Sequence, residues 1–190
     1  MPHILLASGS PRRQELLRRI GITDFTVTVP DVDESYPDDL TPPEIVQYIS
    51  RKKSLAVSSA PDDIVITADT MVFLDEQKLG KPRDEAHALS MLTALQGRCH
   101  KVCTGVTVRQ GDQILTRSQS TDVAFRSASQ QELLAYIRSG EPMDKAGAYG
   151  VQGQGALLVD RIDGDFFNVM GLPVALLAQM LGTFGVNLLE

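Results

Sequence analysis

Two hydroxyls and two guanidinium groups are concentrated in a short segment near the N-terminus. Ser8 and Ser10 precede Pro11, and Arg12 and Arg13 follow it directly. Because serine followed by proline is typical of a helix start, we expect these side chains around a helix N-terminus, where free N–H groups and the helix dipole favour an anion. The segment therefore predicts a phosphate-binding site. An ordinary capped helix with solvated arginines is the alternative.

Two carboxylates have the right setting to bind a metal or to activate water. Asp69 lies at the end of a β-branched run that predicts a buried strand over 63–70, and functional acids are common at strand ends in open α/β sheets. Glu34 is in an acidic loop at 31–39. Most such loops are simply solvated, although one carboxylate of the loop could be a metal ligand.

Two lysines and a glutamine add to the candidate set. Lys53 is on the last turns of a predicted helix, where solvated surface charge is the alternative interpretation. Lys81 lies between a glycine and a proline, so we expect it on a rigid loop. Gln152 is in the glycine-rich stretch 141–155, whose composition predicts close approach of the backbone to another group.

These residue types together favour phosphate chemistry. The candidates are Ser8, Arg12, Arg13, Glu34, Lys53, Asp69, Lys81 and Gln152. Phosphoryl transfer needs cations and a metal to neutralise charge on the phosphate oxygens, and a carboxylate to orient or deprotonate water. No nucleophilic side chain is required. The residues alone therefore predict a metal-dependent hydrolase of a phosphorylated small molecule.

An alternation of strands and helices must position these side chains. Strands are predicted at 4–7, 25–29, 63–70, 101–109, 114–125 and 156–162. The strand at 63–70 is expected to continue in an extended conformation to residue 74, and turns are predicted at 75–78 and 163–165. Helices are predicted from residue 11, over 42–57, 84–95 and 129–138, and from 173 to 181. This order predicts an α/β fold, a mixed twisted sheet flanked by helices, with a central hairpin and two lobes separated by a substrate cleft.

Composition excludes several classes of protein. The 190 residues are 43% hydrophobic and 22% charged, which is ordinary for a folded chain, and the net charge of −6 argues against a nucleic-acid polymer as partner. No run is long enough for a membrane span and no signal peptide is visible, so we expect a cytoplasmic protein. P-loop and H-E-x-x-H motifs are absent, and the two cysteines at 99 and 103 are too few for a disulfide framework. Together with His100 they offer only three potential ligands, whereas a zinc site usually needs four, which argues against zinc.

Several ordered motifs extend over almost the whole chain. They are LASGSPRR at 6–13, ADT at 68–70, GKP at 80–82, VAFR at 123–126, SGEP at 139–142, DKAGAYGVQG at 144–153 and NVMGLP at 168–173. In these motifs the sequence resembles the Maf-type nucleoside triphosphate pyrophosphatases. The resemblance implies a single Maf-like domain over 1–190 with a Maf/inosine-triphosphatase-like fold, a homodimer, and hydrolysis of a nucleoside triphosphate to the monophosphate and pyrophosphate, assisted by Mg²⁺ or Mn²⁺.

The resemblance also implies roles for individual residues. Asp69 corresponds to the general base, and Asp69 and Glu34 correspond to the metal-binding residues. The phosphate-binding groups correspond to Ser8, Arg13, Lys53 and Lys81. The positions that specify the substrate correspond to Arg12, Thr70 and Gln152. This set is similar to the branch that acts on dTTP and UTP, whereas the 7-methyl-GTP branch typically has Ser-Asp-Gln at 68–70 and an acidic residue in place of Gln152. A glutamine amide can donate a hydrogen bond to O4 and accept one from N3–H of uracil or thymine.

Several points stay open. Lys52 adjoins Lys53, so either lysine could hold phosphate, and two phenylalanines at 166–167 stand where tyrosine is frequent in the family. Asp144 and Lys145 could simply pair with each other. The base could instead be a deaminated purine. In a different class, the protein would be a nucleotide-sensing regulator of cell division and septum formation that acts by binding.

Overall fold

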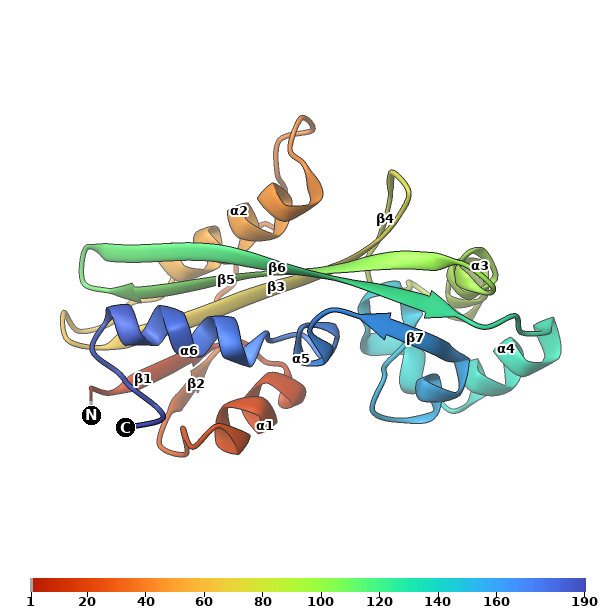
Figure 1. Ribbon diagram of the computed structural model, residues 1–190. Helices are drawn as coiled ribbons and strands as arrows, with labels where there is room; N and C mark the ends of the chain where they lie inside the picture. The colour runs from red at the N-terminus through yellow and green to blue at the C-terminus, as the bar shows by residue number, and fades with distance from the viewer. Residues whose placement is uncertain (1) are drawn as a thin grey trace. The chain divides into compact units, whose positions relative to one another are not determined.

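The computed structural model describes residues 2–190 and has a mixed sheet flanked by helices (Figure 1). The strands are β1 (Ile4–Ala7), β2 (Thr26–Thr28), β3 (Ile64–Leu74), β4 (Gln77–Leu79), β5 (Cys99–Gln110), β6 (Gln113–Phe125) and β7 (Val159–Asp163). The helices are α1 (Pro11–Arg19), α2 (Pro42–Leu55), α3 (Glu85–Leu95), α4 (Gln130–Arg138), α5 (Phe166–Val169) and α6 (Val174–Thr183). The strand order is β2-β1-β3-β5-β6-β7, with β4 paired to β3.

The chain divides into two compact units. The first consists of the residues up to 69 together with 104–119 and 171–190, and the second of 70–103 and 120–170. Strands β3, β5 and β6 contribute residues to both units.

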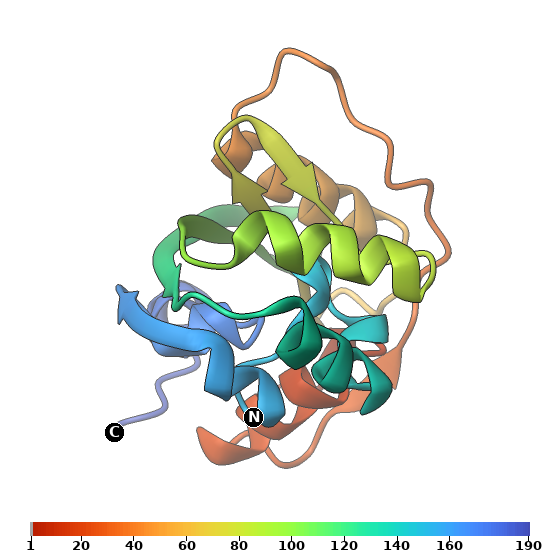
Figure 2. The same ribbon diagram turned by 90° about the vertical axis from the view of Figure 1, so that its right-hand side faces the viewer.

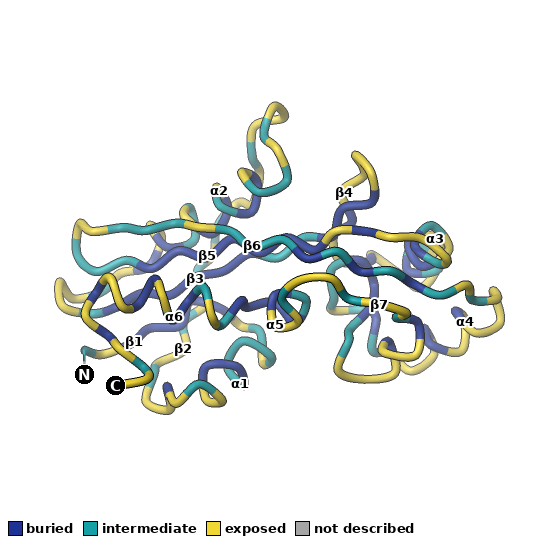
Figure 3. The backbone as a smooth tube through the Cα atoms, viewed as in Figure 1, coloured by how far each residue is buried: buried dark blue, intermediate teal, exposed yellow. Residues whose placement is uncertain are grey.

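In the first unit, parallel strands are covered by helices on both faces. Strand β1 pairs in parallel with β2 and β3, with Leu6 opposite Val27 and Ile66. Helix α2 lies on one face of the sheet, and α1 and α6 lie on the other (Figures 1 and 2). Because both faces are covered, all four residues of β1 are buried, and β3 and β5 are dark blue along most of their length in Figure 3.

Local signals set where the helices of this unit begin. Helix α2 begins with the predicted capping box, in which Thr41 N–H donates to the Glu44 carboxylate at 2.8 Å. Helix α1 begins at Pro11 as predicted, but the Ser10 side chain makes no capping hydrogen bond.

At the C-terminal end of α2, Arg109 Nη2 donates to the carbonyls of Ser54 at 3.1 Å and Val57 at 2.7 Å. These bonds satisfy carbonyl groups that a helix end leaves without partners.

In the second unit, α3 and α4 pack side by side over a shared apolar core (Figure 2). Its largest buried members include Leu92, Leu95, Phe125, Leu133 and Tyr149. The predicted helix starts at 84–85 and 129–130 are confirmed: the side chains of Asp84 and Ser129 accept hydrogen bonds from the N–H groups of His87 and Glu132. The predicted central hairpin is also confirmed, as β5 and β6.

Three sequence-based predictions about elements are wrong. The extended continuation to Leu74 is confirmed, but it belongs to the same strand, so Asp69 and Thr70 lie within β3 and do not end it. The turn predicted at 75–78 is also too long, because Gln77–Leu79 form β4 and pair with β3. The strand predicted at 156–162 begins only at Val159, because 154–158 form a short 3-10 helix. Helix α5, for which the sequence analysis made no prediction, is capped by Asp165, whose carboxylate accepts from two N–H groups.

Among residues 2–190, no helix is long and apolar enough to cross a membrane.

Candidate functional site

The loop before α1 carries a buried hydroxyl that is tied to the first turn of the helix. Ser8 is buried, and its Oγ accepts from the N–H of Ser10 at 3.3 Å and from Nη1 of Arg13 at 3.1 Å. The strand–loop–helix geometry predicted for this segment is therefore present. Helix α1 has no acidic residue in its first turn, so Arg12 and Arg13 add their charge to the positive end of the helix dipole. This end of α1 favours an anion.

Arg13 is fixed by backbone carbonyls from distant segments. Its Nε donates to Gly171 O at 2.8 Å and its Nη1 to Ala68 O at 3.0 Å. Burial lowers the pKa of the Arg13 guanidinium, while the charge of Asp69 acts in the opposite direction. Arg13 thus joins the start of α1 to β3 at the residue directly before Asp69.

Lys53, Asp69 and Glu34 form a charged cluster in the first unit. Lys53 Nζ lies 2.9 Å from Asp69 Oδ1 and 2.8 Å from Glu34 Oε1, and only 14% of the Lys53 side chain is exposed. The neighbouring Lys52 has weaker contacts with the acidic loop, 3.4 Å to Ser35 O and 3.7 Å to Asp33. Lys53 rather than Lys52 therefore contacts the proposed catalytic carboxylate.

The second oxygen of Asp69 is an unusual feature of this cluster. Asp69 is only 6% exposed, and its Oδ2 is buried without a hydrogen-bond partner among the described residues. A buried carboxylate oxygen normally has a partner, because leaving it unsatisfied is costly. Asp69 lies within β3 and does not end it. The parallel neighbour β1, however, has Leu6 opposite Ile66 of β3 and stops at the next residue, Ala7. Asp69 therefore lies beyond the point at which β1 ends.

This cluster fits a divalent cation that is bound partly by substrate. The carboxylates of Asp69 and the exposed Glu34 are oxygen ligands of the kind that Mg²⁺ and Mn²⁺ prefer. Within residues 2–190 no group of three or more His, Cys, Asp or Glu side chains could hold a metal ion. Mg²⁺ is commonly bound through one or two carboxylates, with water and substrate phosphates as the other ligands, so a pair of carboxylates suffices.

The remaining predicted site residues belong to the second unit. Thr70 follows Asp69 in β3 and is half-buried, whereas Lys81 and Gln152 are exposed. The loop that carries Lys81 is fixed on both sides, because Pro82 is buried and Gly80 O accepts from the N–H of Gly147 at 3.1 Å.

Glu141 holds the glycine-rich loop around Gln152, a role that sequence reasoning missed. Its carboxylate accepts from the N–H groups of Gln154 at 2.9 Å and Gly155 at 3.0 Å, and from the Tyr136 hydroxyl at 2.8 Å. Burial raises the pKa of Glu141, but these hydrogen bonds outweigh it and lower the pKa below its usual value. A β-carbon at Gly153 would collide with this carboxylate. The spacing of glycine in 150–155 was the available signal, since it leaves room for such a partner.

Asp144 and Lys145 form a charge pair in the same segment. Lys145 Nζ lies 2.8 Å from the Asp144 carboxylate and also donates to Glu141 O at 2.8 Å. The pairing considered from the sequence is therefore confirmed, and it helps to brace the loop.

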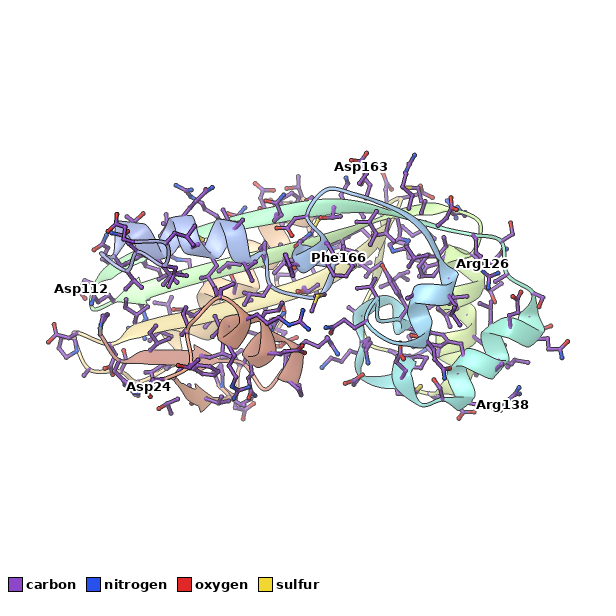
Figure 4. All side chains as sticks on the ribbon, turned by 60° about the horizontal axis from the view of Figure 1, so that its bottom comes forward. Asp24, Asp112, Arg126, Arg138, Asp163 and Phe166 are labelled. Atoms are coloured by element: carbon purple, nitrogen blue, oxygen red, sulfur yellow. The ribbon has the colours of Figure 1, made fainter. Side chains whose placement is uncertain are left out.

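The two phenylalanines at the start of α5 lie at the surface. Phe166, labelled in Figure 4, and Phe167 are both exposed, and their rings pack edge to face.

His100 belongs to the core of the second unit rather than to a metal site. Its Nε2 lies 2.6 Å from the Tyr149 hydroxyl, and its ring packs edge to face on Phe125 and Tyr149. Burial lowers the pKa of His100 to about 4, so the imidazole is neutral at physiological pH. Cys99 and Cys103 are both free thiols.

The sequence matches a known protein family and is similar to several known proteins. The family model described as Maf-like protein matches residues 3–184. A dTTP/UTP pyrophosphatase of Symbiobacterium thermophilum is 48% identical over 186 residues, which are 97% of this chain and 95% of the relative. The proteins of the same name from Exiguobacterium sibiricum and Bacillus pumilus are 47% and 43% identical, and the matches cover 97% and 98% of this chain and 93% and 99% of those relatives.

Two solved structures share the fold at much lower identity. A HAM1 protein from Coxiella burnetii has a TM-score of 0.52 at 12% identity, covering 96% of this chain and 100% of that one. The Ham1 protein of Staphylococcus aureus has a TM-score of 0.51 at 15% identity, covering 96% and 99%. These likenesses support the mixed α/β architecture alone, because fold does not determine function.

Proposed function

This chain belongs to the Maf family, and from that premise we propose that it is a nucleoside triphosphate pyrophosphatase that hydrolyses dTTP and UTP to the monophosphate and pyrophosphate. The observation that carries the proposal is Asp69, whose Oδ1 is held by Lys53 while its Oδ2 is buried without a hydrogen-bond partner among residues 2–190. Relatives that match over nearly the whole chain at 42–48% identity are named for this activity.

Asp69 is the general base of the proposed reaction. Its Oδ2 takes a proton from water, the water oxygen bonds to the α-phosphorus, and the bond from that phosphorus to the bridging oxygen breaks to release pyrophosphate. Lys53 at 2.9 Å prevents the carboxylate from rotating, so that Oδ2 keeps its direction. Ser8, Arg13, Lys53 and Lys81 bind phosphate oxygens.

Asp69 and Glu34 are the residues that would hold the divalent cation. When bound, Mg²⁺ or Mn²⁺ supplies positive charge that neutralises the phosphate oxygens as the bond breaks. The pairing of Lys53 with both carboxylates keeps them close together.

Arg12, Thr70 and Gln152 are proposed to select the substrate. Gln152 presents an amide whose N–H₂ can donate to O4 and whose oxygen can accept from N3–H of uracil or thymine. Because Glu141 anchors the N–H groups of residues 154 and 155, the segment that carries Gln152 is held in place on its C-terminal side.

Further proposals depend on family resemblance and composition. They are a single Maf-like domain over residues 1–190, a homodimer, a cytoplasmic location, and no nucleic-acid polymer as partner. The hypothesis of a nucleotide-sensing regulator of septum formation is not favoured, because the relatives are named for hydrolysis.

A panel of nucleoside triphosphates tests the proposal. The purified protein is incubated with dTTP, UTP, CTP, ATP, GTP, ITP and 7-methyl-GTP, with and without Mg²⁺, and pyrophosphate release is measured. We expect dTTP and UTP to have the highest kcat/KM of the panel. We expect pyrophosphate release only when Mg²⁺ is present. A preference for ITP would instead support a deaminated purine, and release of orthophosphate without pyrophosphate would contradict the proposed reaction.

A further inference from the structure

Helix α2 carries a stripe of polar side chains that contact the sheet one after another. The members are Gln47, Ser50 and Lys53, each of which is three residues from the next and so neighbours it on the helix surface. Gln47 Nε2 donates to Ser118 Oγ on β6 at 2.8 Å, and Ser50 Oγ lies 2.9 Å from Thr107 Oγ1 on β5. Lys53 reaches β3 through Asp69.

A second contact between α2 and β3 lies directly beside the contact of Lys53 with Asp69. The hydroxyl of Thr67 donates to the backbone carbonyl of Ser50 at 2.7 Å. Thr67 and Asp69 are two residues apart on β3 and so face the same side, while Ser50 and Lys53 are three apart on α2. The two contacts therefore join the same helix face to the same strand face, one turn of helix apart.

Thr67 and Ser50 are both 0% exposed, so this hydrogen bond is fully buried. The apolar residues of α2, Ile45, Val46 and Ile49, are also fully buried, but hydrophobic burial has no preferred direction. A buried hydrogen bond does have one, because leaving its polar groups unpaired is costly. The polar contacts can thus fix the position of the helix along the strand, whereas the apolar contacts only hold the two together.

We propose that Thr67 is a positioning residue for catalysis: its hydrogen bond to Ser50 O holds α2 in the register in which Lys53 reaches Asp69. Thr67 acts on the Lys53 ammonium through the helix and not by direct contact. The inference depends on the proposed function, since it assigns catalysis to Asp69.

Thr67→Val tests this inference, because valine keeps the shape and removes the hydroxyl. With Mg²⁺ and UTP, we expect kcat to fall about 10-fold or more while KM changes by less than about 3-fold, because misplacing a catalytic group by a fraction of an ångström affects the transition state most. Thr67→Ser keeps the hydroxyl and should restore kcat to within about 2-fold of the wild type, since the hydrogen bond is retained.

Thr116→Val is the matched control. Thr116 Oγ1 bonds Thr107 Oγ1 at 2.9 Å at the far end of the same network, so this variant removes one threonine hydroxyl without touching β3. We expect a lower melting temperature but an unchanged kcat. If Thr67→Val lowers the melting temperature as Thr116→Val does and leaves kcat unchanged, Thr67 is structural only and the inference is wrong.

A second variant keeps the test decisive if Thr67→Val does not fold. Thr67→Ala removes the same hydroxyl without placing a methyl group against the Ser50 carbonyl that accepts its hydrogen bond. We expect kcat to fall as in Thr67→Val, and an unchanged kcat would overturn the inference. A wild-type protein that releases no pyrophosphate from any nucleotide would instead contradict the proposed function, which separates the two failures.

Discussion

At the scale of single residues, the two oxygens of Asp69 have different surroundings. Oδ1 accepts from Lys53 at 2.9 Å, and Oδ2 is buried and has no hydrogen-bond partner among residues 2–190. Stability alone would favour pairing both oxygens, so the arrangement is best explained by a ligand, water or cation that completes it. Asp69 is therefore where a conservative substitution should separate function from folding.

Asp69→Asn tests this separation. Asparagine has the same shape but cannot take a proton from water, so we expect pyrophosphate release to fall by about 10²–10⁴-fold, the usual contribution of a general base. The carbonyl oxygen of asparagine can still accept from Lys53, so the far-UV circular dichroism spectrum should be unchanged. Wild-type turnover in this variant would contradict the role of Asp69.

Gln152 should decide which base is accepted. In Gln152→Glu the carboxylate has no N–H to donate to O4, so we expect the preference for UTP in kcat/KM to fall by about 10–100-fold, which corresponds to ~1–3 kcal/mol for a bidentate contact. Gln154→Glu is the control, since Gln154 is also exposed and its backbone N–H makes the contact with Glu141. Equal substrate rankings for the two variants would show that Gln152 does not read the base.

At the scale of elements, the glycine-rich segment depends on one half-buried carboxylate. Glu141 binds two backbone N–H groups and the Tyr136 hydroxyl, and Tyr136 in turn accepts from the N–H of Gly150 at 3.1 Å. Because no regular helix or strand pairs these N–H groups, a side chain must satisfy them. The segment around Gln152 thus depends on the ionised form of Glu141.

Glu141→Gln should therefore destabilise the protein in a pH-dependent way. Hydrogen bonds lower the pKa of Glu141 in the folded state below the 4.5 of an unperturbed glutamate, so its contribution is fully present above about pH 4.5 and is lost as the pH falls through the folded value. We expect the free energy of unfolding in urea to drop by about 1–3 kcal/mol at pH 7, the worth of hydrogen bonds to a charged group.

The difference between wild type and Glu141→Gln should shrink when the same unfolding experiment is done near pH 3. Asp112→Asn is the control, because Asp112 is exposed on the turn between β5 and β6 and is labelled in Figure 4. Its stability should match the wild type at both pH values. A difference for Glu141→Gln that is as large near pH 3 as at pH 7 would contradict the role of the ionised carboxylate.

At the scale of the whole molecule, folding and cation binding should be separate. Lys53 pairs with both Asp69 and Glu34, so the chain itself supplies a positive charge that holds these two carboxylates together. Catalysis, by contrast, needs the extra positive charge on the phosphate oxygens. The protein should therefore stay folded without a divalent cation but be inactive.

Chelation tests this separation. With EDTA present, we expect pyrophosphate release to be lost while the melting temperature changes by less than about 4 °C, which corresponds to under ~1 kcal/mol for a chain of this size. Addition of excess Mg²⁺ or Mn²⁺ should restore activity. Unfolding by EDTA would show a structural metal, and full activity in EDTA would show that no divalent cation takes part.

The sequence by itself determined the local structure and the kinds of chemistry available. Capping boxes at residues 41–44 and 129–132, proline at the start of α1, and runs of β-branched residues are signals between near neighbours, and the corresponding elements are present. The density of hydroxyls, cations and carboxylates, read with the ordered motifs, was enough to indicate phosphate chemistry.

Only the tertiary structure decided which of these groups meet. Lys53 contacts Asp69 while Lys52 contacts the acidic loop, and Arg13 donates to Gly171, which is 158 residues away. Residues 77–79 pair with β3 as β4 although they were expected largely as a turn, and the 3-10 helix at 154–158 lies where Glu141 binds backbone N–H groups. Such partners leave no periodic pattern in the sequence, because packing brings them together after local structure has formed.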